Sequence, residues 1–144
     1  MTATNLRLAI VTSTFSPEIT GGLRKGAEDY LAEAGAPNAA HFSAPGAFEI
    51  PLIAQKLAQS GRYDGVICLG CVIKGDTAHF EYISGAASLG LMNASLATGI
   101  PLTFGIITTY TEEQAIARSR DDAHNKGREA AAACIAALAT LAQV

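Results

Sequence analysis

The chain contains four short apolar runs of the length and character of buried strands. The runs are LRLAIVTS at 6–13, NAAHFSAP at 38–45, YDGVICLGCV at 63–72 and LTFGIITT at 102–109. The third run is apolar on both of its faces, as the central strands of a parallel sheet are. The second is the weakest of the four, because polar residues interrupt it. The pattern therefore predicts four strands.

Between and after these runs, apolar residues recur every three or four positions, which is the spacing of a helix. Helices are predicted over 20–35, over 51–60, over 77–98, from Thr111 onward, and from about Asn125 to the chain end. Gly35 suits the end of the first helix, and Pro51 suits the first turn of the second, where a missing N–H costs nothing. Thr111-Glu-Glu has the form of a capped helix start.

Strand and helix alternate throughout, which predicts a parallel sheet with helices on both faces. At 144 residues the chain suits one domain, spanning residues 1–144. We therefore expect an α/β fold, a three-layer α-β-α sandwich with a flavodoxin-like four-stranded parallel sheet. Folds of this kind bind their ligands beyond the carboxyl ends of the strands.

Composition narrows the classes of function. Apolar residues make up 49% and charged residues 16%, so we expect part of the apolar surface to lie in a subunit interface. A net charge of −3, with no Lys/Arg cluster among aromatic residues, predicts no nucleic-acid partner. No apolar run approaches the roughly 20 residues of a membrane span, so no membrane partner is expected. The start, MTATNLRLAIVTSTF, lacks the regions of a signal peptide, which favours a cytoplasmic protein.

Three cysteines, Cys68, Cys71 and Cys134, are odd in number and suit a reducing compartment. Cys68 and Cys71 form a C-x-x-C, but a strand-like run contains it, whereas a thioredoxin-type pair opens a helix. No second pair is present to build a zinc site. We interpret the pair as buried, small, apolar side chains, and we expect no metal.

The segment GCVIKGDTAHFEY (70–82) combines features of two kinds of site. Gly70 and Gly75 have the spacing of a P-loop, but Asp76 stands where a lysine would reach the outer phosphates, which disfavours a nucleoside triphosphate. The unpaired N–H groups at the start of the helix that follows attract an anion, with the Thr77 hydroxyl alongside. The segment therefore predicts a site for one phosphate group, with the Asp76 carboxylate turned outward.

His79 falls in the first turn of that helix, where the helix dipole favours a neutral imidazole that can both accept and donate a proton. A capping or packing histidine is the alternative, and position alone leaves the two evenly balanced. His41 and His124 have no pattern of partners, and we interpret them as bystanders.

Aromatic and acidic candidates lie at the ends of the strands. Phe15 follows the first strand and offers a flat face to a planar ligand. In PGAFEIP, Phe48 and Glu49 straddle a strand end and a helix start. Taken alone, they are explained as a core residue and a carboxylate near a helix dipole. Phe104 lies within the fourth strand, where a core position is the default.

Arg118 and Lys126 lie eight residues apart in ARSRDDAHNKG and provide two cations for an oxyanion. A solvated charged surface is the usual meaning of such a stretch. Together, the candidates form a sheet edge with an aromatic platform, a carboxylate, a phosphate-holding helix start, a histidine and two cations. That set suits a planar polar heterocycle and a small phosphate ester.

Four ordered segments, PGAFEIP, CLGCVIKGDTAHFEYIS, IPLTFGIITT and EEQAIARS…NKG, together resemble the 6,7-dimethyl-8-ribityllumazine synthase family over essentially the whole chain. The resemblance implies a transferase that performs the penultimate step of riboflavin biosynthesis. Its members join 5-amino-6-(D-ribitylamino)uracil to 3,4-dihydroxy-2-butanone 4-phosphate and release phosphate and water, without metal or organic cofactor. The resemblance also implies a homopentamer with active sites at the subunit interfaces, and leaves a larger assembly open.

By position, the resemblance assigns a role to each candidate residue. Phe15 would stack on the pyrimidine, and His79 would transfer protons. Asp76 and Thr77 would hold the phosphate through backbone and hydroxyl, with Arg118 as its counter-charge. The uracil edge and the ribityl chain, whose hydroxyls Glu49 would bind, would be held by Ala47, Phe48, Glu49, Cys71, Val72 and Ile73.

Phe104 and Lys126 would close the site from the neighbouring subunit in a ring of five. The chain departs from the common family pattern after the first strand, where TFS replaces R-[FW]-N, so a contact of that asparagine falls to Ser16 or is lost. Lys74 replaces a commoner arginine, which keeps the charge but not the bidentate fork. The amino-terminal extension is short, which leaves assembly beyond the pentamer open.

Two other functions stay open at this point. A flavin-holding protein is the alternative from a binding class, because flavodoxin-like edges bind FMN and riboflavin resembles the lumazine product. A yellow, flavin-fluorescent preparation without turnover would identify it. The other alternative is a shell-forming subunit, which a monomer or dimer in solution would exclude.

Overall fold

The structure, a computed structural model, describes residues 5–144, so the extension at 1–4 lies outside the described residues. Four parallel strands form one sheet in the order β2-β1-β3-β4. They are β1 (Leu8–Ser13), β2 (Ala40–Ala44), β3 (Gly65–Ile73) and β4 (Leu102–Thr109). All four predicted strands are confirmed, and their bounds differ from the prediction by at most two residues.

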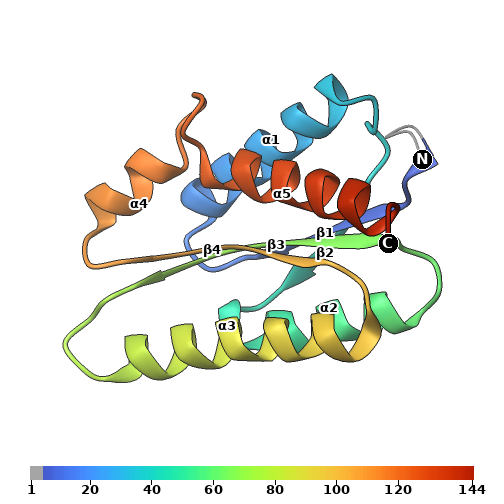
Figure 1. Cartoon of the computed structure of the whole chain (residues 1–144). Helices are drawn as coiled ribbons and strands as arrows, with labels where there is room; N and C mark the ends of the chain where they lie inside the picture. Colours follow the sequence, from blue (N-terminus) through green and yellow to red (C-terminus); the bar gives the residue numbers. More distant parts are fainter. Residues whose placement is uncertain (1–4) are drawn as a thin grey trace.

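Helices cover both faces of the sheet, so the α/β class and the three layers are confirmed. The helices are α1 (Pro17–Glu33), the short 3-10 helix η2 (Ala47–Glu49), α2 (Ile50–Gln59), α3 (His79–Thr98), α4 (Glu112–Arg118) and α5 (Lys126–Leu141). In Figure 1, α1 and α5 lie over one face, and α2 and α3 lie over the other. No helix within residues 5–144 has both the length and the apolar character needed to cross a membrane.

Two predicted helix starts are wrong. The first helix begins at Pro17 rather than at Thr20, because Pro17 occupies the first turn, and the preceding Ser16 takes a left-handed conformation with φ 58°. The third helix begins at His79, two residues after Thr77. The Thr77 hydroxyl instead accepts the backbone N–H of His79 at 3.3 Å, a local hydrogen bond that competes with a helical turn.

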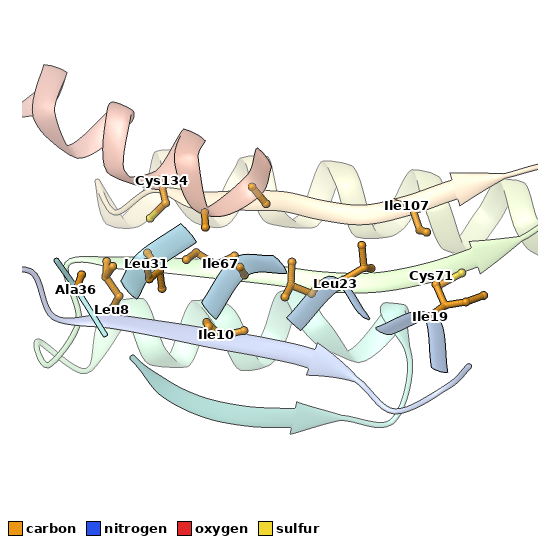
Figure 2. Packing of buried hydrophobic residues seen from close by; sticks show 14 of the residues in the cluster. Leu8, Ile10, Ile19, Leu23, Leu31, Ala36, Ile67, Cys71, Ile107 and Cys134 are labelled. Carbon is orange, nitrogen blue, oxygen red and sulfur yellow. The ribbon is translucent and has the colours of Figure 1, made fainter. Parts of the chain in front are cut away.

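The core consists of two clusters, one on each face of the sheet. Eight of the nine residues of β3 are buried, as expected for a strand with neighbours on both sides. Figure 2 shows the cluster beneath α1 and α5, with Cys134 and Leu31 toward the amino ends of the strands and Ile19, Cys71 and Ile107 toward the carboxyl ends.

The three cysteines are buried and unpaired, as the sequence predicted. Side chains alternate across a strand, so Cys71 joins the α1/α5 cluster and Cys68 joins the α2/α3 cluster. Burial raises the pKa of the Cys71 thiol to about 11 and that of Cys134 to about 12. Cys68 and Cys71 therefore do not form a redox pair.

The start of α5 is fixed against α1 by Asn125, a residue that is 1% exposed. Its side-chain oxygen accepts the N–H of Arg128 at 3.0 Å, which caps the helix. Its amide nitrogen donates to the carbonyl oxygens of Gly22 at 3.1 Å and Arg120 at 2.8 Å. These bonds tie α1, the segment after α4 and the first turn of α5 into one unit.

Candidate active site

A cavity of about 710 Å³ opens at the carboxyl edge of the sheet. We call it the β3 cavity, because β3 ends in it. The chain passes from β1 outward to β2, and from β3 outward to β4, so the edge between β1 and β3 is the switch point where such folds bind ligands. Nine predicted site residues line this cavity: Phe15, Ala47, Phe48, Glu49, Cys71, Val72, Ile73, Thr77 and His79.

Two phenylalanine rings form exposed walls of the β3 cavity. Phe15 follows β1 and is 66% exposed, and Phe48 lies in η2 and is 58% exposed. The alternative that Phe48 is a core residue is therefore wrong. Exposed rings at a cavity mouth have faces available for stacking on a planar ligand.

The Glu49 carboxylate lies near the backbone of Gly46. Glu49 immediately precedes α2 but makes no side-chain capping hydrogen bond to that helix. A Cβ at position 46 would lie 3.3 Å from Oε1 of Glu49, so glycine leaves room for the carboxylate. Glu49 is exposed and lines the β3 cavity, where its oxygens are available as hydrogen-bond acceptors.

The loop 74–78 joins β3 to α3 along the rim of the cavity, and every residue in it is exposed. Its first residue continues the sheet, since the N–H of Lys74 donates to the carbonyl of Thr109 at 2.9 Å. Within residues 5–144, the N–H groups at positions 75 to 78 have no acceptor. Asp76 is not among the residues that line the β3 cavity. Successive unpaired N–H groups before a helix are a typical anion-binding arrangement.

His79 is the first residue of α3, is exposed, and lines the β3 cavity. The helix cap is Ala78, and no residue in the described range 5–144 hydrogen-bonds to the imidazole. The ring therefore has neither of the roles that the alternative required, capping or packing in the core. Because the side chain lines the cavity, its imidazole is available to exchange protons with a bound molecule.

The remaining cations lie in a second depression of about 420 Å³, which we call the β4 hollow. Phe104, Arg118, Lys126 and Glu129 line it, together with uncharged residues of β4 and α5. Phe104 is 46% exposed, so its predicted default as a core residue is wrong. Because β4 is an edge strand, this hollow lies at the side of the sheet.

The two cations of the β4 hollow have different partners. The Arg118 guanidinium donates to the carbonyl of Gln114 at 3.0 Å and forms no ion pair with any residue between 5 and 144. Lys126 pairs with Glu129 at 2.8 Å, and both side chains are exposed. Arg118 therefore keeps most of its donors available for an external anion.

No residue lines both the β3 cavity and the β4 hollow. Arg118 consequently lies with Phe104 and Lys126 rather than beside Thr77, where a counter-charge to the phosphate was expected. One chain thus separates the apolar surfaces and the histidine from the cations. No group of three His, Cys, Asp or Glu side chains in residues 5–144 is placed to hold a metal ion.

Five residues that the sequence reasoning missed also line the β3 cavity: Pro45, Gly46, Gly75, Phe80 and Ile83. Phe80 and Ile83 are three residues apart on α3, a spacing that puts them on one face of the helix directly after His79. The sequence spacing could therefore have predicted that both residues line the same site as His79. Gly75 was considered only for its spacing from Gly70. Pro45 and Gly46 belong to PGAFEIP, in which only Ala47, Phe48 and Glu49 received a predicted role.

Comparison with known proteins gives a consistent result. A family model described as 6,7-dimethyl-8-ribityllumazine synthase matches residues 5–142. The 6,7-dimethyl-8-ribityllumazine synthase 1 of Caulobacter vibrioides is 65% identical over 140 residues, which cover 96% of this chain and 92% of that protein. The 6,7-dimethyl-8-ribityllumazine synthase of Deinococcus deserti is 46% identical over 144 residues, covering 99% and 92%. The protein of that name in Chloroherpeton thalassium is 47% identical over 137 residues, covering 94% and 88%.

Proposed function

The chain belongs to the 6,7-dimethyl-8-ribityllumazine synthase family, and we propose that its β3 cavity is where this transferase of riboflavin biosynthesis brings its two substrates together. The reaction joins 5-amino-6-(D-ribitylamino)uracil to 3,4-dihydroxy-2-butanone 4-phosphate and releases phosphate and water. The observation that carries the proposal is the gathering of nine predicted site residues around one cavity at the switch point of the sheet.

The aminopyrimidine occupies the part of the cavity between η2 and the end of β3. The exposed ring of Phe15 stacks on the pyrimidine, and Glu49 accepts hydrogen bonds from ribityl hydroxyls. Cys71 contributes through its main chain, because its thiol packs in the α1/α5 cluster. The adjacent Val72, whose side chain packs on the opposite face, supplies apolar surface on the α2/α3 side.

The butanone phosphate places its phosphate against the loop 74–78. The unpaired N–H groups of this loop and the Thr77 hydroxyl bind the phosphate oxygens, and the start of α3 adds the positive end of its dipole. Because Arg118 lies in the β4 hollow, we assign the counter-charge of this phosphate to Arg118 of a neighbouring subunit. Phe104 and Lys126 of the same neighbouring subunit close the site.

The substrates supply the reactive groups. The 5-amino group attacks the ketone and gives an imine and water. Loss of the proton from the neighbouring carbinol carbon then expels phosphate and leaves an enol, which becomes a ketone. The ribitylamino nitrogen attacks this ketone and closes the ring with loss of a second water. Holding both molecules in register contributes on the order of 7–11 kcal/mol to lowering the barrier. His79 moves protons between the nitrogen and oxygen atoms that react, an effect worth about 10²–10⁴-fold in rate.

We propose that the protein assembles into a ring of five, and the surface of α3 supports association between subunits. Its outward side carries an apolar stripe of four residues with helical spacing: Tyr82, Leu89, Met92 and Leu96. These side chains are between 58% and 75% exposed in the single chain. A group of exposed apolar side chains on one helix is typical of subunit interfaces.

The three unpaired thiols suit the reducing cytoplasm, and we propose that the protein works there.

The direct test mixes the purified protein with both substrates and follows the fluorescent lumazine against a no-enzyme control, which is essential because the two compounds condense slowly unaided. A rate well above the control, saturating in both substrates, is expected. A rate equal to the control from a folded oligomer would refute the proposal. A yellow, flavin-fluorescent preparation without turnover would identify the flavin-holding alternative instead.

A further inference from the structure

Tyr110, the first residue after β4, lies between the two ends of the loop 74–78. Its ring centroid is 6.0 Å from that of Phe80 in the first turn of α3, with 40° between the ring planes. The ammonium nitrogen of Lys74, at the other end of the loop, lies 5.7 Å from the same centroid. One aromatic ring therefore contacts the residues on both sides of the loop.

The backbone of Tyr110 is held by a hydrogen bond, whereas the loop is hydrogen-bonded to the sheet only at its first residue. Its N–H donates to Oε1 of Gln114 at 2.8 Å, and Gln114 also forms a reciprocal capping box with Thr111 at the start of α4. The carbonyl of the preceding Thr109 accepts the N–H of Lys74 at 2.9 Å. The ring thus extends from a hydrogen-bonded backbone toward a loop in which, among the described residues 5–144, the N–H groups at positions 75 to 78 have no acceptor.

The contact with Lys74 leaves the charge of the ammonium available. Among residues 5–144, Lys74 forms no ion pair with a carboxylate. An aromatic face attracts a cation without neutralising it, whereas a carboxylate would cancel the field that an incoming anion feels. Tyr110 therefore confines a lysine charge beside the loop and keeps it effective toward an anion.

We propose that Tyr110 is a positioning residue for the phosphate-bearing substrate, which fixes Lys74 and Phe80 and so shapes the loop 74–78. The proposal rests on the proposed function for the identity of that substrate. Tyr110 is 67% exposed and belongs to neither core cluster, so a role in stabilising the fold does not account for its contacts. The residue acts through Lys74 and Phe80, and the proposal gives it no contact with the reacting atoms.

The test compares Tyr110→Ala with Tyr110→Phe in steady-state kinetics and in binding of inorganic phosphate. For Tyr110→Ala we expect KM for the butanone phosphate and the Kd of inorganic phosphate to rise by about two- to fivefold, the size of an exposed cation–π contact. KM for the aminopyrimidine and kcat should stay within error. Tyr110→Phe keeps the ring face and should restore both constants.

Tyr63 offers a matched control at the opposite end of β3. Its ring also contacts a phenylalanine, Phe42 at 6.1 Å, and a cation, Arg62 at 5.5 Å. Tyr63→Ala, assayed well below its unfolding temperature, should leave the phosphate constants unchanged. An unchanged phosphate Kd in Tyr110→Ala, or an equal rise in Tyr63→Ala, would overturn the proposal.

The two proposals fail in different ways. If the wild-type protein does not turn over its substrates, the proposed function is lost, but the inorganic-phosphate Kd still reports whether Tyr110 shapes an anion site. If the wild type turns over normally and Tyr110→Ala keeps every wild-type constant, only the role of Tyr110 is lost.

Discussion

The β3 cavity and the β4 hollow differ in size, lining and charge. The cavity, about 710 Å³, is bounded by exposed phenylalanine rings and apolar strand ends, with one imidazole, of His79, and one carboxylate, of Glu49. The hollow, about 420 Å³, brings Arg118, Lys126 and Glu129 together around one phenylalanine. The first suits a flat organic ring, and the second suits an anion.

The outer surfaces of the helices show a related contrast. The α1/α5 side carries ion pairs such as Lys25–Asp29 and Arg128–Glu33, which is typical of a surface in water. The α3 side instead exposes its apolar stripe. We infer that α3 faces another subunit, and that each subunit contributes its β4 hollow to complete the β3 cavity of a neighbour. Substitutions in the α3 stripe, the β3 cavity and the β4 hollow should therefore have different effects.

The largest effect is expected from a charge placed in the α3 stripe. Leu89→Lys puts an ammonium into the proposed interface, where an uncompensated buried charge costs about 3–5 kcal/mol. Analytical ultracentrifugation should show monomers in place of the wild-type assembly, and activity should fall to near the no-enzyme rate because no site is complete.

Ala32→Lys makes a matched control, since Ala32 is exposed on α1, on the opposite side of the molecule. This variant should assemble and turn over like the wild type. An intact assembly in Leu89→Lys would contradict the assignment of α3 to the interface.

A smaller but still large effect is expected within the β3 cavity. His79→Ala should lower kcat by about 10²–10⁴-fold without abolishing turnover, because positioning of the substrates remains. Stopped-flow fluorescence of the lumazine product would measure it. His124→Ala, at an exposed histidine outside both depressions, should behave as wild type. Complete inactivity of His79→Ala in an assembly of wild-type size would contradict the proximity-dominated mechanism.

Substitution of a cation in the β4 hollow should change KM rather than kcat. Arg118→Ala removes charge-assisted hydrogen bonds worth about 1.5–3 kcal/mol, so KM for the butanone phosphate should rise by about 10- to 100-fold. KM for the aminopyrimidine should change little. Arg120→Ala is the control, because Arg120 is exposed and lines neither depression. A loss confined to kcat in Arg118→Ala would rule out its role as the phosphate counter-charge.

The smallest effect concerns strain beside the β3 cavity. Ser16 adopts φ 58°, a left-handed conformation that costs most non-glycine residues roughly 1–2 kcal/mol. Asparagine tolerates this conformation better, so Ser16→Asn should raise the free energy of unfolding by up to about 1 kcal/mol, as measured in urea. The same change at Ser43, in extended β2, should not stabilise the protein. A lower free energy of unfolding in Ser16→Asn would contradict the claim that the backbone at Ser16 is strained.

The sequence predicted the strands and most of the cavity because both depend on local pattern. The bounds of β4 match the prediction, and the residues around His79 lie in one segment that leads from β3 into α3. The prediction failed where local competition or tertiary contacts decide. The Thr77 hydroxyl delays the start of α3, and the exposure of Phe48 depends on what η2 packs against.

The separation of Arg118 from the β3 cavity also could not be predicted from the sequence. Arg118 is the last residue of α4, the helix that follows β4. Its position depends on the capping box at Thr111, which starts α4, and on the hydrogen bonds of Asn125, which join α5 to α1. These contacts join residues far apart in the chain, so spacing alone does not reveal them.

Subunit complementation tests the central claim most directly. His79→Ala chains and Arg118→Ala chains, co-expressed and purified as mixed oligomers, would be assayed at low butanone phosphate, where each parent is weakly active. If each site takes its cavity from one chain and its cations from the next, about a quarter of the sites in a random mixture contain both native residues. We predict recovery to about that fraction of wild-type activity. Activity no higher than the average of the two parents would show that both residues serve the same chain's site, and would contradict the account.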